Sequence, residues 1–168
     1  MQKNNQKPHA FFRSTPLVWG ALMALCMAGC AGGRYSPESH KKIMALKETH
    51  LQFIDEFTED DEGKDWELLR FDREALQVGL EFNKALEFAE TLADKQRILN
   101  FQLLKNTFQD DRALIGKKSR LLTPIESETL LKPTLKIYEK ALEAECVRTD
   151  GPGVGELCIP SDRWRRKQ

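Results

Sequence analysis

One segment of this chain, residues 68–92, carries an apolar residue at every third or fourth position over more than three heptads. The apolar positions are Leu68, Phe71, Ala75, Val78, Phe82, Ala85, Ala89 and Leu92. Side chains at this spacing share one face of an α-helix, and so narrow a stripe is buried best against another helix. The pattern therefore predicts a bundled helix that begins near Asp65, a suitable N-cap before Trp66.

A second helix is predicted from Ser36 onward. Ser36 is a favoured N-cap, Pro37 suits the first helical position, and Glu38 places an acid in the first turn. The stripe that follows, again at spacings of three and four, is Ile43, Leu46, His50, Phe53 and Phe57. The acidic stretch 59–63 is expected to end this helix in a turn.

After Leu92 the apolar register changes. The next apolar set, Ile98, Phe101, Phe108 and Ile115, starts six residues later and so lies on another face. Residues 66–115 could form one long helix with a changing buried face, but a break near Asp94 is the preferred interpretation. Gly116 is expected to end this helix, with Lys117 and Lys118 placed to suit the negative end of its dipole.

The last predicted helix begins with a capping box. In Thr123-Pro124-Ile125-Glu126, the Thr and Glu side chains can each bond the other's backbone N–H. Its stripe is Leu131, Leu135, Tyr138 and Leu142, and Pro133 is expected to kink or divide it. No segment is typical of strands. The predicted fold class is all-α, an antiparallel bundle of three or four helices with a disulfide-closed C-terminal loop and a basic tail.

The first 29 residues have the pattern of a secretory signal. Lys3, Lys7 and Arg13 precede an apolar run from Leu17 to Ala28, and the chain has no acidic residue before Glu38. A cationic start, about a dozen apolar residues and small residues at the end are typical of such a signal. The run is shorter than the roughly 20 residues needed to span a bilayer.

The signal ends in Met27-Ala28-Gly29-Cys30, which resembles the lipobox of bacterial lipoproteins, with Met27 where Leu is usual. That resemblance implies cleavage before Cys30 and a covalent lipid on this cysteine, stable because two or more acyl chains anchor where one does not. It also implies passage to the outer membrane, facing the periplasm, because Ala31 is not Asp. The alternative is a plain signal cut near Gly29 that leaves Cys30 free.

These features divide the chain into four parts. They are a signal peptide (1–29), a lipidated tether (30–36), a helical bundle domain (37–146), and a C-terminal loop and basic tail (147–168). Removing the signal removes three basic and no acidic residues, which leaves 23 basic and 26 acidic and a net charge near −3. Such a balance gives no support for nucleic acid as a partner.

Two cysteines remain once the signal is removed and Cys30 carries lipid. Cys146 and Cys158 flank a Gly-Pro loop, and disulfides persist in the oxidising compartment to which the signal directs the chain. A disulfide is the preferred interpretation. The alternative, a zinc site, lacks a histidine near either cysteine in the sequence, so two cysteines would be half a site.

Motifs for catalysis or cofactor binding are weak. Gly116-Lys117-Lys118-Ser119 lacks the earlier glycine and the strand of a phosphate-binding loop. His50 has no Glu three residues before it, as helical di-metal sites require, and is interpreted as a packed, hydrogen-bonded core residue. No catalytic residue, metal ligand or cofactor besides the lipid is predicted, and the chain is not expected to be an enzyme.

Two surfaces are candidates for binding. Leu69, Leu76 and Leu80 lie off the main stripe of residues 68–92, together with Leu86 and Phe88, and one partner helix cannot cover so wide an arc. In the tail, Arg163, Trp164, Arg165 and Arg166 combine cations with an interfacial tryptophan, as suits an anionic lipid surface. A solubilising terminus explains the tail equally well.

The leading hypothesis is a non-enzymatic, membrane-anchored envelope lipoprotein that binds another envelope protein or itself. The alternative is a bundle that carries a ligand or metal in its core through His50 and nearby acids.

Overall fold

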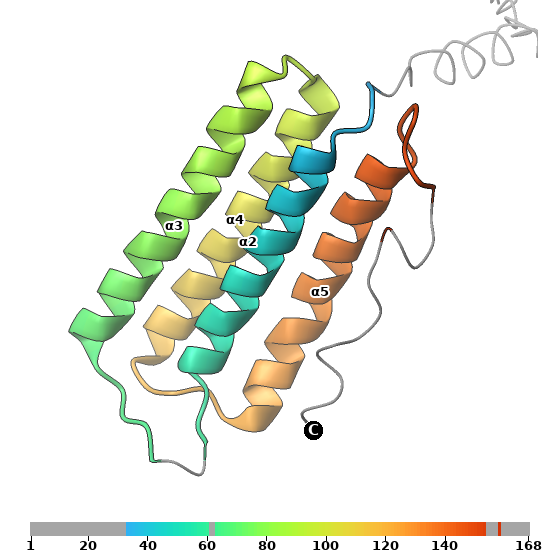
Figure 1. The fold of residues 1–168 in the computed structure, drawn as a ribbon. Coiled ribbons are helices and arrows are strands. Elements are labelled where there is room, and N and C mark those ends of the chain that lie inside the picture. Colours follow the sequence, from blue (N-terminus) through green and yellow to red (C-terminus); the bar gives the residue numbers. More distant parts are fainter. Residues whose placement is uncertain (1–32, 61–62, 154–157, 159–168) are drawn as a thin grey trace, which may run out of the picture. The chain divides into compact units, whose positions relative to one another are not determined.

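The computed structural model describes residues 33–60, 63–153 and 158. Four helices follow one another along this part of the chain: α2 (Pro37–Glu56), α3 (Leu68–Thr91), α4 (Lys95–Lys118) and α5 (Pro124–Cys146). Each runs antiparallel to the next, and α2 packs against α3 and α5 while α4 packs against the same two helices (Figure 1). The predicted all-α antiparallel bundle is confirmed, and four is its number of described helices.

The bundle has two ends, which we call the entry pole and the loop pole. At the entry pole, residues 33–36, 92–97 and 145–151 meet where α2 and α4 begin and α3 and α5 end (Figure 1). At the loop pole lie residues 57–67 and 119–123. An isolated bridge ties each pole, Arg34 with Thr149 and Thr58 with Leu122.

The core is built from the predicted stripes. On α2, Ile43, Leu46, His50 and Phe53 are buried, and so is Phe57 just after it. On α3 the interior members of the stripe are buried, whereas its two ends, Leu68 and Leu92, are exposed. Periodicity alone therefore overestimated the length of the buried stripe.

Three of the described helices begin with a side-chain cap, and two of these caps, at Ser36 and Thr123, are the ones that the sequence predicts. Ser36 accepts a hydrogen bond from the N–H of Ser39, Thr123 and Glu126 form the capping box, and Asp94 caps α4 by accepting from Arg97. The break near Asp94 is therefore confirmed, and residues 66–115 form two helices. Hydrogen bonds from Arg120, Lys118 and the Thr123 backbone hold the pKa of Glu126 well below its usual range.

Two predicted boundaries were wrong. α3 begins at Leu68 with Glu67 as N-cap, not near Asp65, because Trp66 instead packs its ring against Phe57 and Phe71. The other is the end of α4, which continues two residues past Gly116.

Gly116 serves packing rather than termination. A Cβ there would lie 3.1 Å from the Phe71 ring, and the left-handed residue that ends α4 is Ser119, at φ 49°. α5 runs unbroken through Pro133, so of the two effects predicted there, a kink or a division, the division does not occur.

Candidate functional site

The exposed face of α3 carries the leucines that the sequence singled out. Leu69, Leu76 and Leu80 are 76%, 64% and 49% exposed, although the core beneath them is closed. Their spacing of seven and four residues places them on one face of the helix. Of the two other flanking residues, Leu86 packs partly against the core and Phe88 lies under the Lys42 ammonium group, 4.7 Å from its ring centroid. Three leucines therefore remain as an apolar strip, which we call the α3 strip.

A groove of about 210 Å³ runs between α3 and α4 beside this strip. Leu76 and Leu80 form part of its α3 wall, and Lys105 and Arg112 stand on its α4 wall. Phe108, a core residue, also lines it. An apolar ridge next to a groove with a cationic wall is suited to an amphipathic helix that carries acidic residues along one edge.

A second exposed apolar face was missed from the sequence. Leu99, Leu103 and Leu114 on α4 are 61%, 48% and 44% exposed. They follow one another at intervals of 4 and 11 residues, a helical spacing that could have been recognised once the buried face of α4 was known. The described bundle thus has more than one exposed leucine face, which makes the α4 residues useful controls for the α3 strip.

A polar network crosses the middle of the core. The Nδ1 atom of His50 lies 3.2 Å from the Tyr138 hydroxyl, which donates to the Leu46 carbonyl. The Nε2 atom lies 3.1 Å from Oδ2 of Asp111 without a well-directed hydrogen bond, and that oxygen accepts from Thr134. Burial, with a further contribution from the Asp111 charge, raises the pKa of Tyr138 above its usual value.

His50 is therefore a packed core histidine. It is fully buried, and the rings of Phe82, Phe108 and Tyr138 meet it edge-on at centroid distances of 5.3–5.9 Å. Among the described residues, no group of three His, Cys, Asp or Glu side chains gathers around it at metal-ligand distances. Asp111 and Thr134 could not be assigned to this network from sequence, because neither continues an apolar stripe.

The hollow between α2 and α3 is polar rather than apolar. This groove of about 490 Å³ is lined by Thr49, Gln52, Phe53, Glu56, Glu74, Gln77, Val78 and Glu81. Sites that bury small organic ligands are mostly apolar, with a few placed polar groups. A lining with three glutamates has the opposite balance, and it gives the ligand-carrying alternative no pocket of the usual kind.

An ionic cluster closes the entry pole. The fully buried carboxylate of Glu145 accepts from Arg97 at 2.7 and 3.2 Å and lies 3.1 Å from Arg148 Nε. Asp94 pairs with both arginines. Burial tends to raise the Asp94 pKa, but hydrogen bonds from the Arg97 backbone and the Arg148 side chain outweigh it, so this pKa lies below its usual value.

The chain that enters the bundle is held by the same cluster. Ser36 N–H donates to Glu145 at 2.9 Å, the Arg34 carbonyl accepts from Arg97 at 2.8 Å, and Tyr35 N–H donates to Thr149 at 2.9 Å. Residues 33–36, placed in the tether by sequence, are thus part of the folded unit in the region that the structure describes. Thr149 belongs to the segment placed in the C-terminal loop, and it too is fixed.

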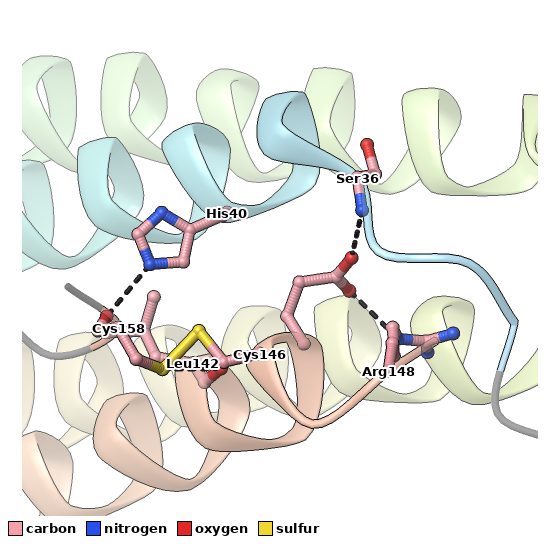
Figure 2. Close-up of a disulfide and its surroundings, with 7 residues drawn as sticks. Ser36, His40, Leu142, Cys146, Arg148 and Cys158 are labelled. Atoms are coloured by element: carbon pink, nitrogen blue, oxygen red, sulfur yellow. Dashed lines mark hydrogen bonds and ion pairs between the residues drawn. A yellow bond between two sulfur atoms is a disulfide. The ribbon is translucent and has the colours of Figure 1, made fainter. Parts of the chain in front are cut away.

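The Cys146–Cys158 disulfide is present, as predicted, beside the entry pole (Figure 2). Sequence reasoning missed its neighbour His40, whose Nε2 atom lies 2.8 Å from the Cys158 carbonyl. The two sulfurs and the imidazole come within 4.8 Å of one another. Because both sulfurs are in the disulfide, neither is the thiolate that metals bind, and the zinc alternative does not describe this state.

Other sequence-predicted site residues lie outside the described part of the chain. They are Cys30 of the lipobox and the tail residues Arg163, Trp164, Arg165 and Arg166. In the part that is described, none of the helices has both the length and the hydropathy needed to cross a bilayer. No protein-family model, curated protein or solved structure matches the chain.

Proposed function

We propose that this chain is a lipid-anchored protein of the bacterial cell envelope whose bundle binds a protein partner through the α3 strip. The anchor rests on Ala28-Gly29-Cys30 at the end of the signal-like run, and Ala31 favours the outer membrane. The role is non-enzymatic. The observation that carries the binding proposal is the exposure of Leu69, Leu76 and Leu80 over a core that closes without them.

The α3 strip is suited to a protein rather than to a small molecule. Its three leucines span 12 residues of helix, and the 11 steps between the first and the last cover about 17 Å at 1.5 Å per residue, a length that a partner helix can cover. Apolar strips of this kind on otherwise polar surfaces usually mark binding sites. The cations Lys105 and Arg112 on the opposite wall of the groove favour a partner helix with an acidic edge.

Site-specific photo-crosslinking in intact cells tests this function. A photoreactive amino acid in place of Leu76 or Leu80 of the full-length chain is expected to trap a discrete adduct, with a second copy or with another envelope protein. The matched control is Leu103, because its exposure of 48% is close to the 49% of Leu80 while it lies on α4. Adducts that form equally at Leu103, or at none of the three positions, contradict the proposal.

A variant that adds charge to the α3 strip separates binding from folding. A photoreactive amino acid in place of Leu69 is expected to trap the same adduct when the rest of the strip is unchanged. Adding two cations with Leu76→Lys and Leu80→Lys is expected to abolish that adduct, while such surface changes leave stability within about 0.5 kcal/mol. Retention of that adduct in a folded double variant would place the contact elsewhere.

A further inference from the structure

We propose that the entry pole rests on the bilayer surface, with Leu92 and Val147 seated at the boundary between headgroups and acyl chains. This inference depends on the lipid anchor at Cys30 proposed above.

Only a short segment of chain separates Cys30 from the entry pole. Gly33 is seated against the ion pair of Asp94 and Arg148, so closely that a Cβ on Gly33 would overlap the Asp94 carboxylate. From Gly33 onward the backbone is held by hydrogen bonds to Arg97, Thr149 and Glu145, so residues 33–36 are not free to move away from the bundle. Three residue steps separate Gly33 from Cys30, and a fully extended chain covers about 10 Å in that interval. A lipid on Cys30 therefore holds the entry pole within about 10 Å of its own attachment point.

The entry pole also carries exposed apolar side chains. Leu92 is 39% exposed after the last turn of α3, and Val147 is 62% exposed after the last turn of α5. Leu92 stands two residues before Asp94, and Val147 directly precedes Arg148. Both residues thus lie close in the chain to the ion pair on which Gly33 is seated.

The charges of the entry pole nearly balance. Within the pole Arg97 and Arg148 are balanced by Asp94 and Glu145, and on its surface Arg34 pairs with Asp150 at 3.1 Å. The exposed Lys95 leaves the pole with four basic against three acidic residues, one cation in excess. Without an excess of negative charge, the pole is not repelled by an anionic leaflet. One excess cation attracts such a leaflet only weakly, so we expect the pole to contact zwitterionic and anionic bilayers alike.

The same geometry disfavours a protein as the occupant. A gap of about 10 Å is no wider than one helix with its side chains, so a protein layer would have to replace the bilayer contact rather than lie between. The anchor also makes contact with the bilayer intramolecular, so weak apolar contacts suffice. With the pole on the bilayer, Leu80 and Leu76 would lie about 18 and 24 Å along α3 from Leu92, on a face clear of the headgroups.

Tryptophan quenching tests the proposal on the full-length lipidated chain in vesicles of brominated phosphatidylcholine, with and without phosphatidylglycerol. The parent is Trp164→Phe, which after signal removal leaves Trp66 at the loop pole as an internal reference. We expect the emission added by Leu92→Trp or Val147→Trp to be quenched in both lipid compositions, and that of Trp66 and of Leu76→Trp to be unchanged. These sites are exposed in the fold, and helical circular dichroism confirms that each variant is folded.

Flotation of the vesicles separates the two proposals. If the protein floats with the vesicles but the tryptophans introduced at positions 92 and 147 are no more quenched than Trp66, the inference about the entry pole is overturned while the anchor stands. Equal quenching at Leu76→Trp means that the bundle lies on its side and also overturns it, as does quenching confined to the anionic vesicles. Failure to float instead contradicts the lipid anchor itself.

Discussion

Phe82→Ala is expected to lower the free energy of unfolding by about 3–5 kcal/mol, because it removes a buried ring and leaves a cavity that the rigid surroundings fill only in part. Phe82 is 1% exposed, stacks on Phe108 at a centroid distance of 5.0 Å, and meets the His50 ring edge-on at 5.9 Å. Its loss therefore opens the centre of the core, where α2, α3 and α4 meet.

Denaturant unfolding measures this effect, with Leu76→Ala as the matched control on the same helix. Leu76 is 64% exposed, so its truncation is expected to change stability by less than about 0.5 kcal/mol. A cost below about 1 kcal/mol for Phe82→Ala would mean that the ring is not a core residue. The division of α3 into a buried stripe and an exposed α3 strip would then be wrong.

Glu145→Gln is the second change expected to have a large effect, about 3–5 kcal/mol, because it removes one partner of a buried ion pair. The Gln amide keeps the shape of the side chain but not its charge, so Arg97 and Arg148 would keep only Asp94 as a counter-ion. The amide can also no longer accept every hydrogen bond that the two carboxylate oxygens accept from Arg97 and from Ser36 N–H.

Glu139→Gln on the exposed face of α5 is the matched control, with an expected change within about 0.5 kcal/mol. Hydrogen exchange gives a second readout, because loss of the cluster should increase exchange at Ser36 N–H and Tyr35 N–H, whose acceptors lie at this pole. Unchanged stability, with protection of both amides retained, would show that the entering chain is not held by Glu145.

Local signals made much of the bundle predictable. Caps at Ser36 and Thr123 depend on a few neighbouring residues, and the stripe around Phe82 repeats at the period of the helix, so both can be recognised without a partner in view. The start of α3 could not be predicted from local signals, because tertiary packing of Trp66 on Phe57 and Phe71 overrode the capping preference of Asp65.

The polar clusters were beyond sequence reasoning for a different reason. Arg97 and Glu145 are 48 residues apart, and His50 and Tyr138 are 88 apart. A charged residue in a helix with many charges carries no mark that its partner lies across the bundle, and most such residues are solvated. Only the register between helices shows that Glu145 is buried, and that register is set by packing.

The exposed leucines of α3 could be predicted from sequence only in part. Their position off the stripe was evident from spacing, since Leu76 and Leu80 fall on the flank opposite the buried alanines and phenylalanines. Spacing alone could not show which exposed leucines bind a partner, because similar leucines on α4 are exposed as well. The groove with its cationic wall distinguishes the α3 strip, and it becomes visible only when α3 and α4 are placed together.

The lipid anchor at Cys30 is the claim on which the proposed function and the orientation of the bundle both depend, and fractionation of cells that express Cys30→Ala tests it most directly. With the anchor, the wild-type protein is expected to remain in the membrane fraction after a high-salt wash, because acyl chains rather than charges hold it. The variant is expected to leave the washed membrane fraction. Cys30→Ala protein that stays with the washed membranes as fully as the wild type would contradict the account.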